Sequence, residues 1–196
     1  MTLLPICETQ QGDVTGYIAS NLISMTDGQL YLSSELFYEG IKPAIDVGLS
    51  VSRIGNKVQP HLLRRVSGSL RLDLLQHQEL MRLTRFAVGS EETAQRQRRG
   101  ILLRRLMSQP AHQPMSVSDE ALLFYAFQTG WLERLNDEGL QICLRGLSER
   151  MPVTVLEALR DNQPISPALL AKLDAVFEDA LQAYVTTSTG VPPHAI

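Results

Sequence analysis

The apolar residues of this chain change their spacing near residues 56–60, and the change divides the sequence into two parts. In the second part the apolar positions recur at steps of three, four and seven, which is typical of helices that bury one face. In the first part the apolar runs are short and predict buried strands. These runs are Leu3 to Glu8, Leu22 to Met25 and Asp46 to Ile54. The pattern predicts an α+β protein.

Turn residues separate the predicted strands. The dipeptide Asp27-Gly28 favours a tight turn, which would make Gln29 to Leu32 a hairpin partner for the apolar run before it. Ser34 to Tyr38 is expected to form one short helical turn, because Pro43 prevents a helix from continuing. The first part of the chain is therefore expected to be mainly sheet and loop.

The first predicted helix follows Pro60 and has one apolar stripe. The members of the stripe are Leu63, Val66, Leu70, Leu74 and Met81. Gly68 lies inside this helix, where glycine costs about 1 kcal/mol relative to alanine. We therefore expect the backbone of another segment to approach Gly68 closely. His77 lies on the same helix and is expected to be a packed residue.

Five more helices are predicted beyond this one, each bounded by capping or breaking residues. Their ranges are Glu91 to Met107, Ser116 to Phe127, Asp137 to Arg150, Val153 to Arg160 and Pro167 to Tyr184. Ser166 suits the N-cap of the last helix, and Pro167 suits its first position. Residues 186–196 contain one glycine and two prolines and are predicted to be a disordered tail.

Charge is distributed unevenly, although the net charge is only −3. Residues 1–52 carry a net charge of −5, residues 53–105 one of +8, and residues 106–196 one of −6. A basic middle raises the alternative of nucleic-acid binding. Base stacking needs interleaved aromatic side chains, and Phe86 is the only one between residues 53 and 105. A solvated or subunit-facing helix surface is favoured, with no nucleic-acid partner.

Other classes of site have little support. Cys7 and Cys143 lack the spacing of a metal or redox motif, which favours free thiols in a reducing compartment. The four histidines have no partner at metal-ligand spacing, so no metal site is predicted. No apolar run approaches the roughly 20 residues that span a bilayer. Direct membrane insertion is therefore not expected.

Several motifs occur in a characteristic order. They are Thr26-Asp27-Gly28-Gln29, Gly40-Ile41-Lys42-Pro43-Ala44, Ser50-Val51-Ser52-Arg53-Ile54-Gly55, Ser67-Gly68-Ser69-Leu70-Arg71-Leu72-Asp73 and Gln113-Pro114-Met115. In order and spacing they resemble the alpha subunit of the F-type, proton-translocating ATP synthase, over about residues 3 to 185. The resemblance implies the C-terminal end of a P-loop nucleotide-binding α/β domain with few strands, residues 1–58. An all-α helical bundle domain, residues 59–185, is expected to follow it.

The phosphate-binding half of a nucleotide site is missing from this sequence. A P-loop has the pattern G-x-x-x-x-G-K-[ST], whose backbone N–H groups and lysine hold phosphate oxygens. No such run occurs in the chain. By comparison with the family, we expect the chain to begin inside the nucleotide-binding domain, beyond the P-loop. The chain alone is predicted to be inactive, with no bound cofactor.

Arg53 is the strongest candidate for a catalytic role. From the residues alone, it is a structural arginine that closes a strand. The resemblance implies that it acts in trans, toward the nucleotide that the neighbouring beta subunit holds, where such an arginine accelerates phosphoryl transfer about 10³- to 10⁵-fold. The resemblance also implies that Ser24 lies beside that catalytic site.

A second, non-catalytic nucleotide site is implied by the resemblance, but only in remnant form. The family supplies its adenine pocket partly with an arginine-proline pair and two glutamines. In this chain the pair is Lys42-Pro43, and the glutamine positions hold Gln109 and Ala111. Lysine lacks the planar guanidinium, so Lys42, Pro43 and Gln109 would form a weak adenine pocket. ATP or ADP with Mg²⁺ is expected only in the complete complex.

The resemblance implies a function within a larger assembly. The chain would be part of the regulatory, non-catalytic alpha subunit, which supports proton-gradient-driven ATP synthesis at beta-subunit sites. Its partners would be the beta and gamma subunits, on the inner face of the cell membrane, and the isolated chain is expected to self-associate. The alternative is a stand-alone helical protein-interaction module. Arg53 separates the two, because a helical adaptor does not need an arginine at the end of a strand.

Overall fold

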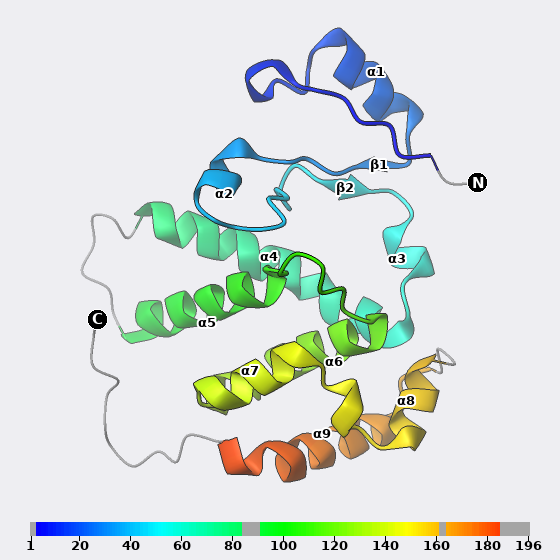
Figure 1. Ribbon diagram of the computed structural model, residues 1–196, viewed down its shortest axis with the longest axis vertical. Coiled ribbons are helices and arrows are strands. Elements are labelled where there is room, and N and C mark those ends of the chain that lie inside the picture. Colours follow the sequence, from blue (N-terminus) through cyan, green and yellow to red (C-terminus); the bar gives the residue numbers. More distant parts are fainter. Residues whose placement is uncertain (1–2, 84–90, 161–163, 185–196) are drawn as a thin grey trace.

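The computed structural model describes residues 3–83, 91–160 and 164–184. Figure 1 shows two parts: a mostly irregular N-terminal segment, residues 3–58, and a stack of helices below it, the helical part, residues 59–184. The fold is α+β as expected, but it is mostly helical, with one small two-stranded sheet. The predicted tail at 186–196 lies outside the described residues.

The N-terminal segment contains short elements joined by long loops. They are η1 (Gln10–Gly12), α1 (Tyr17–Met25), β1 (Gly28–Gln29), α2 (Ser34–Tyr38), β2 (Val51–Ser52) and α3 (Gly55–Val58). The short helix at α2 is confirmed, and the Ser33 hydroxyl caps it by accepting the N–H of Leu36. Gly40 follows α2 with a φ of 81°, a conformation that favours glycine.

Two of the three predicted strands are wrong. Leu22 to Met25 forms the end of helix α1, because Ile18, Leu22 and Met25 are spaced by four and three residues and share one helical face. A four-residue apolar run does not distinguish a strand from part of a helix. Leu3 to Glu8 forms no regular secondary structure.

The third predicted strand, Asp46 to Ile54, is regular only at β2. Asp46 causes the difference, because its carboxylate accepts the backbone N–H groups of Gly48 and Leu49 and turns the chain there. The expected hairpin is also wrong: β1 pairs with β2, which lies more than twenty residues further along the chain. The pairing is antiparallel.

Gly28 allows this pairing to form. It lies opposite Ser52, and a Cβ atom at position 28 would overlap the carbonyl oxygen of Val51. Glycine is thus required by close approach of the two strands.

The helical part follows the sequence prediction closely. Its elements are α4 (His61–Leu83), α5 (Glu91–Met107), α6 (Val117–Gln128), η3 (Leu132–Arg134), α7 (Asp137–Arg145), η4 (Ser148–Arg150), α8 (Val153–Arg160), α9 (Pro167–Leu181) and η5 (Gln182–Tyr184). Ser116 and Ser166 cap α6 and α9 through their side chains, as their positions predict. Helix α7 ends five residues earlier than expected, because Gly146 has a φ of 135° that breaks the helix.

Helix α6 is the centre of the core. Its residues 121–127 are all buried, so it is apolar on every side rather than amphipathic. It packs against α4 through Val66, Leu70 and Leu74, and α8 and α9 lie beyond it (Figure 1). The apolar stripe predicted for α4 is the face that packs in this core. The side chain of Met81, the last member of the stripe, is outside the described residues.

The close approach expected at Gly68 is wrong. Gly68 is exposed, and apart from the backbone of its own helix no atom of the described residues lies within 4 Å of the position that its Cβ would occupy. The close approach is instead at Gly100 of α5, where a Cβ would overlap the imidazole ring of His77. His77 is packed, as predicted.

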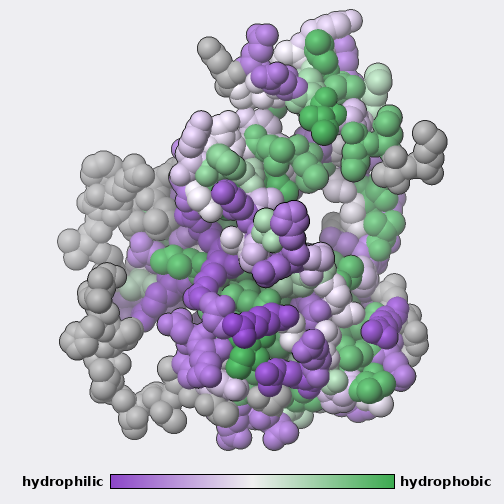
Figure 2. All heavy atoms as spheres, in the orientation of Figure 1, coloured by the Kyte–Doolittle hydropathy of each residue, from purple (hydrophilic) through white to green (hydrophobic). Residues whose placement is uncertain are grey.

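The N-terminal segment contributes little to the core. Of its described residues only Ala44 is buried, and many of its large apolar side chains are exposed. Figure 2 shows hydrophobic residues gathered on the upper part of the molecule, over this segment. Exposed members include Leu4, Ile6, Ile18, Met25, Leu30 and Val58. None of the described helices is long and apolar enough to cross a membrane.

Candidate functional site

Arg53 lies immediately after β2, and the backbone around it is fixed on both sides. Its N–H donates to the carbonyl oxygen of Asp27 at 2.8 Å, next to the β1–β2 pair. The following turn is closed by Ser52, whose hydroxyl accepts the N–H of Gly55 at 3.0 Å. Helix α3 begins at Gly55. The sequence predicted a strand end followed by a glycine turn here, and this local arrangement is confirmed.

The side chain of Arg53 is exposed. No hydrogen bond or ion pair joins its guanidinium to another described residue. An arginine whose role is to close a strand normally donates to a carboxylate or a carbonyl. Two other arginines make such bonds: Arg64 donates to Lys57 O at 2.8 Å, and Arg71 donates to Gly48 O at 3.0 Å. Arg53 thus presents its five donors to the surroundings of the chain.

Ser24 lies in the last turn of α1 and is exposed. Its hydroxyl donates to the carbonyl oxygen of Ser20 at 2.9 Å, within the same helix. The chain then passes through Thr26 to Asp27, whose carbonyl binds the Arg53 backbone. Ser24 is therefore linked to Arg53 through this short stretch of chain and one backbone hydrogen bond, with no direct bond between the two side chains in the described structure.

The structure brings together the three residues of the expected adenine remnant. The backbone N–H of Gln109 donates to the carbonyl oxygen of Lys42 at 2.9 Å, and the Ser108 hydroxyl donates to the same oxygen at 3.2 Å. Pro43 follows Lys42 through a cis peptide bond. Residues more than sixty positions apart in the sequence therefore share one location.

The polar groups of this remnant are used within the protein. The ammonium of Lys42 lies 5.1 Å from the centre of the Phe37 ring, a cation–π contact. The side-chain amide of Gln109 donates to the carbonyl oxygen of Gln113 at 3.0 Å. Both groups would have to give up these contacts to bind an adenine ring.

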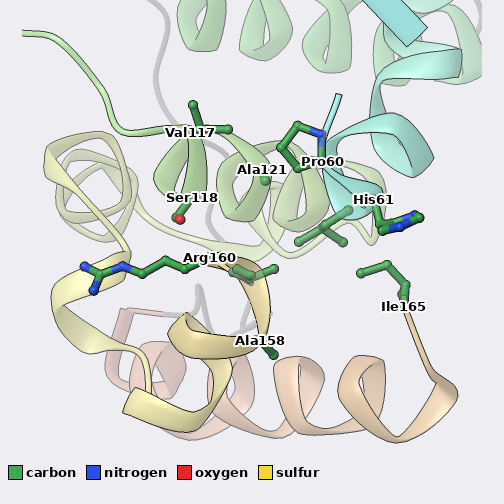
Figure 3. A pocket seen from close by; sticks show the side chains of 10 residues that line it. Pro60, His61, Val117, Ser118, Ala121, Ala158, Arg160 and Ile165 are labelled. Carbon is green, nitrogen blue, oxygen red and sulfur yellow. The ribbon is translucent and has the colours of Figure 1, made fainter. Parts of the chain in front are cut away.

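Two cavities lie elsewhere, in the helical part. The first, of about 320 Å³, lies between the start of α4, α6 and α8 (Figure 3). Its walls include Pro60, Val117, Ala121, Ala158 and Ile165, and His61 and Arg160 lie at its edges. Sequence reasoning missed this cavity, because its lining comes from three distant segments and contains no motif.

The second cavity, of about 530 Å³, lies between α4 and α5. Its lining residues are Asp73, Gln76, His77, Glu79, Leu80, Arg96, Arg99, Gly100, Leu103 and Phe127. Arg99 crosses one side: it pairs with Glu133 and Asp73, and its guanidinium lies 4.2 Å from the centre of the Phe127 ring. Burial, together with the charge of Arg104, lowers the pKa of His77 below its usual range.

Three more titratable groups lie in or beside the core: Asp119 is half-buried, and Tyr125 and Cys143 are buried. Burial would raise the pKa of Asp119, but hydrogen bonds from Ser116 and from the backbone after α7 outweigh it, and the pKa is lowered. Burial and a hydrogen bond to Asp174 raise the pKa of Tyr125. Burial raises the pKa of Cys143 to about 11, so its thiol stays protonated and unreactive.

Comparison with protein families places these features in a known class. Residues 1–52 match the ATP synthase alpha/beta family, nucleotide-binding domain, and residues 59–180 match the ATP synthase alpha/beta chain, C terminal domain. The second match covers more than half of the chain, so the chain belongs to the ATP synthase alpha/beta family.

Within that family the chain corresponds to the C-terminal part of an alpha subunit. It is 40% identical over 191 residues to the "ATP synthase subunit alpha" of Desulforudis audaxviator (strain MP104C). The match covers 95% of this chain but only 38% of the relative. The chain thus spans well under half the length of the curated relative that it matches.

Proposed function

We propose that this chain supplies Arg53 in trans to a nucleotide held by a neighbouring subunit, as part of the alpha subunit of an F-type ATP synthase. The proposal rests on one feature of Arg53: a hydrogen bond holds its backbone in place, while its guanidinium forms no hydrogen bond or ion pair with another described residue. The Arg53 N–H is bound to Asp27 O, while its side chain is exposed. A side chain with a fixed origin and free donors suits contact with another subunit.

The chemistry required at such a position is electrostatic. During phosphoryl transfer, negative charge spreads over the equatorial oxygens of the transferring group, and a guanidinium placed there lowers the barrier. Arginine suits the task because it stays charged and presents a planar fork of donors to phosphate oxygens. Ser24, three residues before Asp27 at the same end of the sheet, would lie beside this site.

The nucleotide itself would be bound elsewhere. ATP or ADP with Mg²⁺ would be held at beta-subunit sites, because this chain contains no P-loop pattern. Lys42, Pro43 and Gln109 would form at most the adenine side of a second, non-catalytic site. In this proposal the isolated chain neither hydrolyses ATP nor retains a cofactor.

The assembly would include beta and gamma subunits and lie on the inner face of the cell membrane through its partners, with proton flow driving ATP synthesis. The exposed apolar side chains of the N-terminal segment support extensive protein contacts there. Without partners the same surface favours self-association of the chain. Residues 1–58 and 59–185 would act as the end of the nucleotide-binding domain and the helical domain.

The role of Arg53 is tested by substitution in an assembled complex whose longer alpha chain carries this sequence. Arg53→Ala is expected to lower multisite ATP turnover by about 10³-fold or more, with normal assembly. Arg53→Lys should recover only part of the loss, because an ammonium lacks the bidentate fork. Arg98→Ala, which removes an exposed arginine of α5, is the matched control and should leave turnover unchanged. A loss of less than about tenfold for Arg53→Ala would indicate a structural arginine.

A second candidate function is a stand-alone helical interaction module. It is favoured by one observation: the buried core lies almost entirely in the helical part, from Leu62 to Leu181. Such a module would bind its partner without Arg53. Partner binding that survives deletion of residues 1–58, with no effect of Arg53→Ala on any ATPase, would support the module instead.

A further inference from the structure

The N-terminal segment rests on two helices at once. On α4, Arg71 donates to the carbonyl oxygen of Gly48 at 3.0 Å. On α5, Arg104 pairs with Glu39 at 3.1 Å. The segment therefore bridges α4 and α5, and its docking depends on the spacing between them.

His77 lies between the same two helices and has no hydrogen-bond partner. It is only 2% exposed, and neither ring nitrogen is bonded within the described structure. Its ring fills the space that a Cβ on Gly100 would occupy, so α4 and α5 are in close contact there. A buried polar group without a partner is costly, and a buried unpaired charge costs far more.

None of the charged groups around His77 in the described structure forms a hydrogen bond with its ring, so none stabilises a proton there in this arrangement. Helix α4 contributes Asp73 and Glu79 to the cavity beside it, and α5 contributes Arg96 and Arg99. Arg104, one turn beyond Gly100, adds a further positive charge near the ring. The facing residue of α6 is the apolar Phe127.

The carboxylates near the ring are largely committed to these arginines. Asp73 and Glu133 both pair with Arg99, and Glu92 pairs with Arg96. Glu79 faces the cavity from an exposed position on α4. A positive charge on His77 would therefore be repelled by the surrounding arginines more than it is attracted by the carboxylates, most of which already pair with those arginines.

We propose that His77 is a proton-sensitive contact that controls the docking of the N-terminal segment on the helical part. Both ring nitrogens are shielded from solvent, although a cavity lies beside the ring, so hydration of a proton on either nitrogen requires α4 and α5 to move apart. Separation changes the distance between Arg71 and Arg104, so the segment cannot keep both anchors. This role does not depend on the proposed function of Arg53.

The sign of the pH effect follows from burial. Because the folded protein holds His77 neutral, its pKa there lies below that of the undocked state, where the ring is solvated. Docking is therefore strongest above the ordinary histidine pKa of about 6.5 and weakens as the pH falls below it. Below the docked-state pKa the weakening is complete.

The test is amide hydrogen exchange of the full chain at about pH 7.5 and about pH 5.0, corrected for intrinsic exchange rates and read by mass spectrometry. Peptides that cover β1 to β2 are expected to lose protection at least about tenfold at the lower pH, while peptides of α6 keep theirs. His77→Phe keeps a ring of similar size that cannot take a proton, and it should abolish the loss. His77→Gln is a second variant in case phenylalanine overfills the contact.

The control is His112→Asn, which removes an exposed histidine whose φ of 62° asparagine also tolerates. It should retain the pH effect of the unmodified chain. The proposal is overturned if protection between β1 and β2 is independent of pH in the unmodified chain. It is also overturned if the His77→Phe variant loses this protection at low pH to the same extent as the unmodified chain. Loss in α6 at the same pH would also overturn it, because the effect would then be global unfolding.

Discussion

The His77 ring packs directly against Gly100 between α4 and α5, so a larger residue at position 100 tests how closely the two helices pack. Gly100→Ala would drive a methyl group into the His77 ring. Overpacking of this kind typically costs about 1–3 kcal/mol. We expect urea unfolding to show a loss of that size.

Gly68→Ala is the matched control for this change. Gly68 lies on the same helix as His77, is exposed, and has open space around its Cβ position. Alanine should stabilise the helix there by up to about 1 kcal/mol. A stabilising Gly100→Ala, equal to the effect at Gly68, would show that the two helices are not in contact at this point.

Asp119 links the start of α6 to the turn after α7. One carboxylate oxygen accepts the Ser116 hydroxyl at 2.6 Å, and the other accepts the Ser148 N–H at 2.7 Å. Asp119→Asn removes the charge from both bonds and should cost about 1–3 kcal/mol at neutral pH. Asp179→Asn, an exposed residue of α9, should cost much less.

The pH dependence of the Asp119 contribution has a definite sign. Because the folded pKa of Asp119 lies below its ordinary value, the contribution is complete above that ordinary value and is lost as the pH falls through the folded pKa. Unfolding free energies should therefore converge for Asp119→Asn and the unmodified chain in acid. A constant difference down to about pH 2 would contradict this account of the carboxylate.

At the scale of elements, the helical part was largely predictable and the N-terminal segment was not. Helices α4 and α9 have long periodic stripes, and Ser166 caps α9, so local sequence is sufficient. The run at 22–25 is too short for its period to decide between helix and strand, and the run at 46–54 is interrupted by the turn at Asp46. The pairing of β1 with β2 depends on a non-local contact at Gly28, which no local pattern reveals.

The candidate site shows the same division. The position of Arg53 at the end of a strand followed from its flanking residues. The proximity of Lys42 to Gln109 could be expected only through the family resemblance, since the two are joined by tertiary contacts. The close contact is at Gly100 and was expected at Gly68, because both glycines lie inside helices and the sequence alone does not say which one faces a neighbour.

Stability should follow burial, element by element. Residues 121–127 of α6 and Leu173 and Phe177 of α9 are buried, whereas Ala44 is the only buried residue described in the N-terminal segment. At about pH 7.5 we expect amides of α6 and α9 to exchange slowest and those between β1 and β2 at least about tenfold faster. Equal protection of both regions in a monodisperse monomer would contradict the view that the segment is completed by other protein surfaces.

At the scale of the whole molecule, we expect independent nucleotide binding to be weak. The P-loop pattern is missing, and the groups of Lys42 and Gln109 are engaged with Phe37 and Gln113. Isothermal titration should therefore show ATP binding to the isolated chain no tighter than about 1 mM, and no hydrolysis above background. A micromolar dissociation constant that Lys42→Ala abolishes would show that the adenine remnant is a working site.

The role of Arg53 is tested most directly by the binding of a transition-state mimic to an assembled complex. ADP, Mg²⁺ and fluoroaluminate imitate the transferring phosphoryl group, and a residue that acts on the transition state contributes to this mimic more than to ATP. We predict that Arg53→Ala weakens binding of the mimic at least about 100-fold while changing ATP binding only a few-fold. Equal affinity of the mimic for both complexes would contradict a catalytic role for Arg53.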